Sequence, residues 1–228
     1  MTTDQSAANR GIAWGRCVRS AGRLFVLSGP SGVGKDTLFA QSRQQLSQME
    51  RSVSCTTRKP RLGERDGVDY HFWSEERFSE SVSSGDFLES AEYGGNWYGT
   101  LRDPVVHLLS TGIDVMLIIE VKGALKARAS IPDAVLIYVA PPSFAELRRR
   151  LENRPDFSAE KIAARLAIAV EELASVPEYD YLIVNQQLDA AAAQLSEVVR
   201  SERLRIDPVA AASLASGLQR ELVAPRNG

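Results

Sequence analysis

The stretch GPSGVGKDT has the residue spacing of a loop that surrounds a phosphate group. Gly29, Gly34 and Lys35 match the pattern G-x-x-x-x-G-K, in which backbone N–H groups and a lysine ammonium bind phosphate oxygens. RLFVLSG before the turn predicts a buried strand, and KDTLFAQSRQQLSQ after it predicts a helix, which is the setting that a phosphate-binding loop needs. The predicted nucleotide-binding loop consists of Gly29, Pro30, Ser31, Gly32, Val33, Gly34, Lys35, Asp36 and Thr37.

One position departs from the pattern, because Asp36 stands where Ser or Thr normally meets Mg²⁺ and the hydroxyl comes one residue later, at Thr37. A carboxylate about 4 Å from a phosphate would repel it by roughly 4 kcal/mol without a metal. With Mg²⁺ between them the carboxylate becomes a ligand. We therefore expect Asp36 and Thr37 to support Mg²⁺. The alternative is that Asp36 caps the helix or pairs with an arginine.

The stretch SVSCTTRKPRLGERDGVDYHF gathers a second set of phosphate-binding side chains. Two arginines three residues apart, with hydroxyl groups beside them, can converge on a phosphate dianion through charge-assisted hydrogen bonds. The candidates are Ser54, Arg58, Arg61, Glu64 and Tyr70. Each residue alone would be an ordinary solvated group, but their joint occurrence favours a phosphate site.

In GDFLESAEYGGNWYGT, Glu89, Tyr98 and Thr100 bracket a glycine turn, and Glu89 is a candidate for reading a base. An isolated buried carboxylate is costly. A carboxylate that accepts hydrogen bonds from N1–H and the 2-amino group of guanine has a reason to be buried.

The elements that position these groups are those of an α/β fold. Unbroken apolar runs at residues 23–29, 114–121, 134–142 and 181–185 predict strands of a parallel sheet. Helical patterns lie between them; two begin at Ser143 and Ser158, the first with Glu146 in the arrangement of a capping box. In such folds ligands bind at the carboxyl ends of the strands.

Composition is that of a globular protein. The 228 residues are 44% hydrophobic and 25% charged, with a formal net charge of -2, so no global charge draws the chain to nucleic acid or to an anionic membrane. Two cysteines and two histidines make a disulfide framework or a zinc site improbable. We see no signal peptide and no apolar run of 18 residues, and we expect a cytoplasmic protein.

Several stretches together resemble the guanylate kinase family: GPSGVGK, SVSCTTRKPRLGERDGVDY, GDFLESAEYGGNWYGT, APPSFAELRRRLENR and YLIVN, in that order. The resemblance implies the P-loop nucleoside monophosphate kinase fold, an α/β fold with a parallel core sheet flanked by helices, a small mixed-β GMP-binding insertion and a helical lid. The expected boundaries are an N-terminal extension (1–22), a kinase-like domain (23–203) and a C-terminal tail (204–228) with only a short helix. Within the domain we expect core segments 23–50, 101–143 and 166–203, the insertion at 51–100 and the lid at 144–165.

The resemblance also implies roles for individual residues. Ser54, Arg58, Arg61, Glu64, Tyr70 and Tyr98 would bind the phosphate side of GMP, and Glu89 and Thr100 would read guanine, assisted by Glu120. Arg150, Arg154 and Arg165 would reach the transferring phosphoryl group from the lid and the helix that follows it. Together with Lys35 and Arg58 they are the expected catalytic residues, and Asn185 would lie near adenine. The implied reaction is ATP + GMP = ADP + GDP with Mg²⁺, in a monomer or homodimer.

Departures from the family pattern leave alternatives open. Ile118 replaces an acidic residue, Glu120 lengthens another, and Asn153 and Pro155 stand where lid glycines are typical. G-K-D also resembles ribose 1,5-bisphosphate phosphokinase, which lacks the arginine-rich insertion signature. Catalytically inactive guanylate-kinase-like binding modules typically lose loop residues and arginines that this chain keeps.

Overall fold

The computed structural model describes residues 21–153 and 158–223. Arg154 and Pro155, both named above as lid residues, lie outside the described residues, and so does most of the predicted N-terminal extension. The chain divides into two units, residues 21–199 and a second unit made of residues 1–20 and 200–228. The larger unit contains every candidate site residue.

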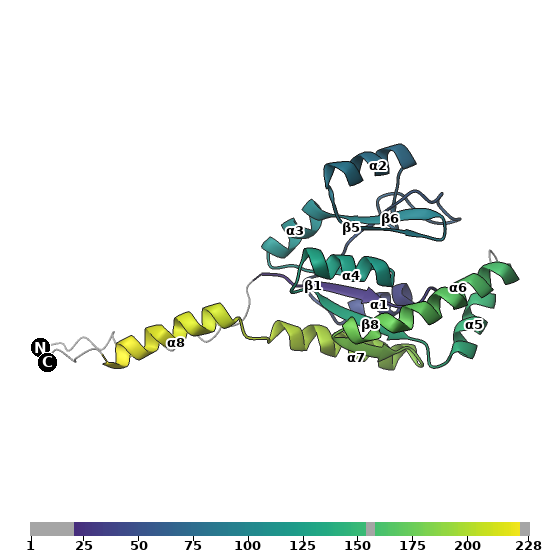
Figure 1. Cartoon of the computed structure of the whole chain (residues 1–228). Helices are drawn as coiled ribbons and strands as arrows, with labels where there is room; N and C mark the ends of the chain where they lie inside the picture. Colours follow the sequence, from purple (N-terminus) through teal and green to yellow (C-terminus); the bar gives the residue numbers. More distant parts are fainter. Residues whose placement is uncertain (1–20, 154–157, 224–228) are drawn as a thin grey trace, which may run out of the picture. The chain divides into compact units, whose positions relative to one another are not determined.

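A five-stranded parallel sheet forms the centre of the larger unit (Figure 1). Its middle strand β1 is buried along its whole length, and Val26 lies opposite Leu117 on one side and Leu136 on the other. The strands in spatial order are β2 (Met49–Arg51), β7 (Asp114–Ile118), β1 (Leu24–Ser28), β8 (Val135–Ala140) and β9 (Tyr181–Val184). The long apolar runs of the sequence become strands because both faces of the sheet are covered.

Helices on the two faces bury this sheet in two hydrophobic clusters. One face packs against α1 and α7 through Leu38, Phe39 and Leu195, and the other packs against α3 and α4 through Val105 and Ala124. The flanking helices are α1 (Lys35–Arg43), α3 (Arg102–Ser110), α4 (Val121–Ser130) and α7 (Leu188–Arg203). This arrangement is the α/β fold that the sequence predicted.

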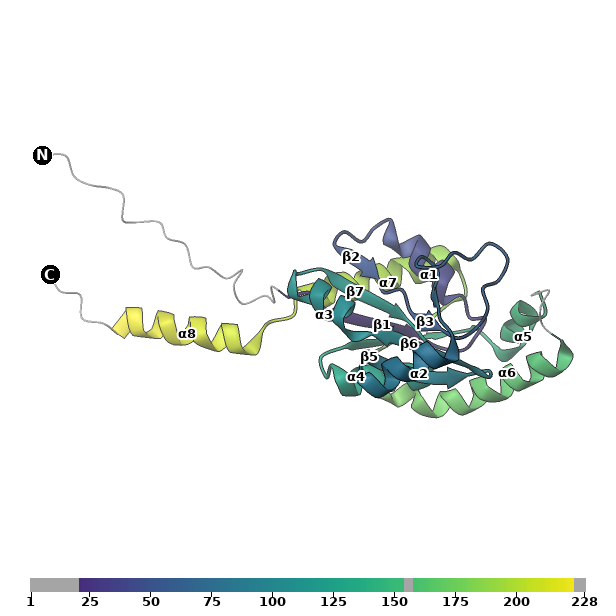
Figure 2. The same ribbon diagram turned by 90° about the horizontal axis from the view of Figure 1, so that it is seen from above.

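A second, mixed sheet forms the segment that follows β2 (Figure 2). Its spatial order is β4-β3-β6-β5, with β3 parallel to β4 and antiparallel to β6. Its elements are β3 (Cys55–Thr56), β4 (His71–Phe72), α2 (Glu75–Ser84), β5 (Phe87–Tyr93) and β6 (Asn96–Leu101). A small core of Cys55, Phe78 and Phe87 holds the helix on the sheet, with the two phenyl rings stacked at 4.6 Å.

Two helices lie between β8 and β9, α5 (Phe144–Glu152) and α6 (Ala159–Glu172), and a 3₁₀ segment, η2 (Leu173–Glu178), follows them. Leu147 and Leu151 of α5 pack against Ile162 and Ala169 of α6. The predicted N-caps are present, since Ser143 Oγ accepts from the N–H of Glu146 at 3.1 Å and Ser158 Oγ accepts from that of Lys161 at 3.4 Å. The capping box of α5 is incomplete, because the Glu146 carboxylate accepts from arginines of its own helix instead.

In the smaller unit, α8 spans Pro208–Val223 and is 16 residues long. The expectation of only a short helix was therefore wrong. Asp207 caps the helix by accepting from the N–H groups of Val209 and Ala210, at 2.9 and 3.0 Å. This cap and an alanine-rich interior both favour helix, and their effects add along the segment.

Candidate active site

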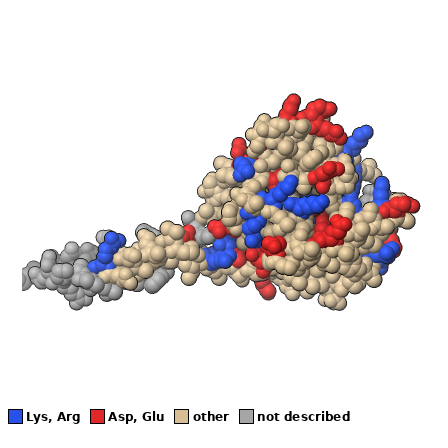
Figure 3. All heavy atoms as spheres, viewed as in Figure 1, with Lys and Arg blue, Asp and Glu red and all other residues tan. Residues whose placement is uncertain are grey.

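A cleft of about 350 Å³ opens at the carboxyl ends of the core strands and extends to the mixed sheet. It is the place where a doubly covered parallel sheet binds its ligands. On the face of the unit seen in Figure 3, basic and acidic side chains are interspersed, so local arrangement must provide any anion site. Of the residues predicted from the sequence, the cleft is lined by Ser31, Gly32, Gly34, Lys35, Asp36, Thr37, Ser54, Arg58, Arg61, Glu64, Tyr70, Glu89, Tyr98, Glu120 and Arg165.

The loop between β1 and α1 is shaped by glycines and ends on a helix N-terminus. Gly29 has φ 141°, and a Cβ there would lie 2.2 Å from the carbonyl oxygen of Val139, so another residue would not fit. Gly34 has φ 98° and precedes the first turn of α1. The loop therefore directs its N–H groups and the positive end of the helix dipole at one position, which suits an anion.

Lys35 is buried at the base of this loop. Its ammonium donates to the carbonyl oxygen of Gly29 at 2.6 Å, and it lies 3.3 Å from Oε2 of Glu120 at the end of β7. The lysine is thus held against the loop by carbonyl and carboxylate oxygens. Phosphate oxygens could take the place of these partners without the lysine leaving the cleft.

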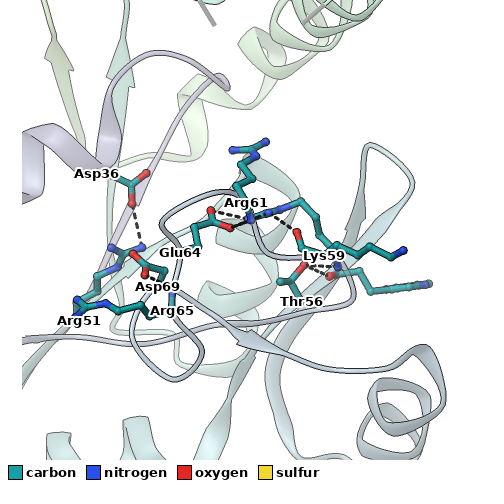
Figure 4. Close-up of polar contacts among 10 residues, drawn as sticks. Asp36, Arg51, Thr56, Lys59, Arg61, Glu64, Arg65 and Asp69 are labelled. Carbon is teal, nitrogen blue, oxygen red and sulfur yellow. Dashed lines mark hydrogen bonds and ion pairs between the residues drawn. The ribbon is translucent and has the colours of Figure 1, made fainter. Parts of the chain in front are cut away.

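Asp36 is paired with an arginine. Its Oδ1 lies 3.0 Å from Nη2 of Arg51, the last residue of β2, and the two are joined by a dashed line in Figure 4. Within residues 21–153 and 158–223, no group of three or more His, Cys, Asp or Glu side chains is placed to hold a metal ion. The assignment of Asp36 and Thr37 to Mg²⁺ stays a prediction, and the ion pair favours the alternative.

Glu64 accepts hydrogen bonds from both Arg58 and Arg61, and Figure 4 labels Glu64 and Arg61. Arg58 donates from Nη1 and Nη2 to the two carboxylate oxygens at 2.9 Å each, and the N–H of Arg61 donates to Oε2 at 2.7 Å. Burial acts to lower the pKa of Arg58, but the hydrogen bond to Glu64 outweighs it and leaves this pKa above its ordinary value. For Glu64 burial raises the pKa, yet the bonds from Arg58 and Arg61 bring it below the ordinary value. Glu64 therefore stays ionised and fixes the Arg58 side chain.

Aromatic rings complete this part of the cleft. The Arg58 guanidinium lies 5.4 Å from the centroid of the Tyr70 ring, within the range of a cation–π contact. The rings of Tyr70 and Tyr98 meet edge to face at 6.0 Å. Beside them the hydroxyl oxygens of Ser54 and Thr100 are 3.4 Å apart. One cation and several hydroxyl groups thus face a common space, a suitable set for a phosphate.

Glu89 on β5 is a buried carboxyl group, 5% exposed, with one hydrogen bond from Thr100 Oγ1 to its Oε1 at 2.8 Å. Burial raises its pKa to about 7. Gly123 provides the room for it, because a Cβ at that position would lie 2.7 Å from Oε2. Glu89 is part of the cleft lining, and among the described residues Thr100 is the side-chain donor to its carboxylate. Such a group is ready to accept from a ligand.

The pKa of Glu89 makes a prediction about stability. Because the folded value of about 7 lies above the ordinary 4.5, the stability contributed by the protonated group is fully present below pH 4.5 and is lost as the pH rises through 7. Glutamine does not titrate, so the Glu89→Gln variant avoids this loss. Between pH 5 and pH 8 we expect its free energy of unfolding to rise by up to about 3 kcal/mol relative to that of the native protein. Urea unfolding of both proteins at the two pH values measures this gain. A difference between them that is independent of pH would contradict the prediction.

The predicted lid residues occupy different surroundings. Arg165 on α6 lines the cleft and lies over the Tyr93 ring, 4.1 Å from its centroid. Arg150 on α5 instead donates to the backbone oxygens of Val33 at 3.0 Å and Asn185 at 2.8 Å, outside the set of residues that line the cleft. Asn185 in turn donates from Nδ2 to the Val33 oxygen at 2.8 Å. Arg150 and Asn185 therefore hold the phosphate-binding loop through the Val33 carbonyl oxygen without lining the cleft.

Several residues that line the cleft were not predicted as site residues from the sequence. They are Arg51, Asp69, Ala91, Tyr93, Ile118, Ile119 and Gly123. Ile118 ends β7 and Ile119 follows it, and their position near the carboxyl end of the predicted strand 114–121 could have placed them here. For Arg51 the signal was weaker, because β2 is only three residues long and shows no recognisable period.

A parallel sheet with a phosphate-binding loop after its first strand, a helical pair over that loop and an inserted mixed sheet define the class of P-loop nucleoside monophosphate kinases. The model of the guanylate kinase family matches residues 21–202, and the chain belongs to that family.

Individual relatives agree with this result. The chain is 46% identical to a guanylate kinase of Lactococcus lactis subsp. lactis over 84% of this chain and 94% of the relative. It is 48% identical to one of Synechococcus sp. over 78% and 94% of the two chains. The crystal structure of guanylate kinase from Anaplasma phagocytophilum is similar with a TM-score of 0.68 and 34% identity, covering 82% of this chain and 89% of that one.

Proposed function

We infer that the protein phosphorylates GMP to GDP with ATP as the phosphoryl donor. One observation carries the inference: a single cleft joins the loop with Lys35 to the Arg58–Glu64 pair and to the buried Glu89. The first two sets bind phosphate groups, and the third accepts from a base with two adjacent donors. Family membership over residues 21–202 supports the same reaction.

Phosphoryl transfer between these substrates needs little covalent chemistry from the protein. The acceptor oxygen of a nucleoside monophosphate is already anionic, so no strong general base is required, and the difficulty is to align two polyanions. We propose that Lys35 and the loop N–H groups hold the donor phosphates and that Arg58, Arg61 and Tyr70 hold the acceptor phosphate with Ser54 and Tyr98. Arg165 reaches the cleft from α6 and would neutralise charge on the transferring group.

Arg150 and Asn185 have a supporting role in this proposal. Their bonds to the Val33 carbonyl fix the loop that must direct its N–H groups at the phosphates. Closure of α5 and α6 over bound ATP would exclude water from the transfer. On closure Arg150 would exchange its contacts with backbone oxygens for a contact with the transferring phosphoryl group. That exchange would agree with the catalytic role predicted for Arg150 and Arg154.

Mg²⁺ is part of the proposal and would be bound chiefly by nucleotide phosphates, with one or two protein oxygens. Thr37 and Glu120 are cleft residues that could supply those oxygens, whereas Asp36 is paired with Arg51. When bound, the ion would neutralise phosphate charge.

The reaction is tested by coupled ADP release with ATP and four acceptors: GMP, AMP, UMP and ribose 1,5-bisphosphate. We expect turnover with GMP far above the others. Preference for the sugar bisphosphate would establish the alternative kinase. Absence of turnover with all four acceptors, in protein that binds GMP, would indicate an inactive binding module.

The ion pair of Asp36 makes a prediction about the metal. Since Arg51 already neutralises this carboxylate, we expect native protein and Asp36→Ser to show the same Mg²⁺ dependence of ATP affinity within about a factor of three, a difference below 1 kcal/mol. Calorimetric titration of ATP with Mg²⁺ or with EDTA measures it. A native protein that loses ATP binding in EDTA while the variant keeps it would show instead that Asp36 supports the metal.

None of the helices within the described residues has the length and apolar character needed to cross a membrane. We propose further that the protein acts in the cytoplasm on small-molecule substrates, as a monomer or homodimer, without binding nucleic acid or membrane.

A further inference from the structure

Arg51 is a cation of the cleft that none of the roles above includes. It ends β2, the edge strand of the core sheet, and its backbone pairs with Met116 of β7. Its position at the carboxyl end of a parallel strand is the same as that of the loop after β1 and of Glu120 after β7. Arg51 is therefore on the ligand-binding edge of the sheet.

The Arg51 side chain lines the cleft that contains both phosphate-binding parts. Its guanidinium meets Asp36, in the first turn of α1 and next to Lys35, at 3.0 Å (Figure 4). Tyr70 of the insertion lines the same cleft. Burial and then the charge of Asp36 raise the pKa of Tyr70 to about 12, while the charge of Arg51 acts in the opposite direction, so both charges act on this hydroxyl.

The Arg51 side chain keeps donor capacity beyond its ion pair. A guanidinium has five N–H donors in a fixed planar fork, and one ion-pair contact to Asp36 occupies a part of them. The side chain is 27% exposed and lines the cleft, so the remaining donors can be reached by a ligand. Arg58 and Tyr70, the proposed ligands of the acceptor phosphate, line the same cleft.

We propose that Arg51 is a substrate-binding residue that donates to the phosphate of the acceptor nucleotide, and that Asp36 is a positioning residue that holds its guanidinium at the boundary of the donor and acceptor sites. The proposal rests on the proposed function. It gives the unusual aspartate of the phosphate-binding loop a purpose other than metal binding. It also accounts for a carboxylate next to a phosphate site, because the pair is neutral as a unit.

The chain contains a matched control for this pair. Arg43 and Glu50 also connect α1 with β2, with the same N–O distance of 3.0 Å, but neither residue lines the cleft. If Arg51 acted only by tying the helix to the strand, loss of Arg43 would have a comparable effect.

The experiment measures dissociation constants of GMP, guanosine and ATP for native protein, Arg51→Ala, Arg51→Lys and Arg43→Ala. We expect Arg51→Ala to weaken GMP about 10- to 100-fold, as for a charge-assisted hydrogen bond, and to leave guanosine and ATP within about threefold. Arg51→Lys should recover part of the affinity, and Arg43→Ala should resemble native protein. Equal weakening of GMP and guanosine, or equal effects of the two alanine variants, would overturn the proposal.

A double-mutant cycle tests the role of Asp36. With Arg51 present, Asp36→Asn should weaken GMP, because the guanidinium is less firmly held. In the Arg51→Ala background the same change should strengthen GMP, because only repulsion between the carboxylate and the phosphate is removed. The same effect in both backgrounds would show that Asp36 does not act through Arg51. Native protein that fails to bind GMP would refute the proposed function itself, before any variant is compared.

Discussion

Glutamine in place of Glu89 is expected to abolish most of the preference for GMP over AMP. In the proposed complex the native carboxylate would accept from N1–H and the 2-amino group of guanine, whereas adenine has neither donor and would leave the buried carboxylate with the Thr100 hydroxyl alone as its side-chain donor. Rejection of such a ligand corresponds to a factor of about 10³ or more in kcat/KM. In the variant one acceptor becomes an amide donor, so GMP loses a hydrogen bond and AMP no longer meets a buried charge.

Steady-state kinetics with GMP, IMP and AMP measure this selectivity in both proteins. IMP keeps N1–H but lacks the amino group, and we expect native protein to rank it between the other two. The Thr100 hydroxyl can still donate to Oε1 of glutamine, so the fold is expected to persist. Comparable use of AMP and GMP by native protein would refute the assignment of Glu89 to the base.

Loss of the Arg58 side chain should have the second largest effect. Its fork with Glu64 is one of the most fixed arrangements in the cleft, and a phosphate bound there would receive a preorganised cation. We expect Arg58→Ala to reduce kcat/KM for GMP by about 2–4 kcal/mol, roughly 30- to 1000-fold. Arg61→Ala should act in the same direction, and ATP affinity should hardly change in either variant.

Arg77→Ala is a suitable control, since Arg77 lies in the same insertion over the Trp73 ring, 4.0 Å from its centroid, and does not line the cleft. Calorimetry with ATP and GMP separates the two sites. An equal loss of both affinities in Arg58→Ala would mean that this arginine serves the structure or the donor site.

The sequence predicted the core of the fold because four of its strands are continuous apolar runs, and it predicted α5 and α6 because each begins at a recognisable serine cap. The strand β2 was not predicted, since three residues contain no period and Met49 alone points to burial. The length of α8 was missed because alanine gives a helical propensity but no amphipathic pattern.

The site was predicted where residue types combine with a motif, as in the loop at Lys35 or the arginines of the insertion. Partners made by the tertiary fold could not be predicted. Asp36 and Arg51 are brought together by the packing of α1 and β2, which neither segment predicts alone. The partner of Asp36 therefore stayed open in the sequence analysis. Arg150 likewise offers its donors to Val33 and Asn185, although its sequence position suggested only contact with a phosphoryl group.

The small core of the insertion has a consequence for thiol chemistry. Cys55 is fully buried against Phe78 and Phe87, and burial raises its pKa to about 12, so almost no reactive thiolate exists near neutral pH. Oxidants and alkylating reagents can therefore reach this sulfur only when the β3–β6 pairing opens. The rate at which Cys55 is modified would therefore measure how often the region that holds Arg58 and Glu89 opens. A nucleotide bound to this region would slow the modification of Cys55 without contacting the thiol.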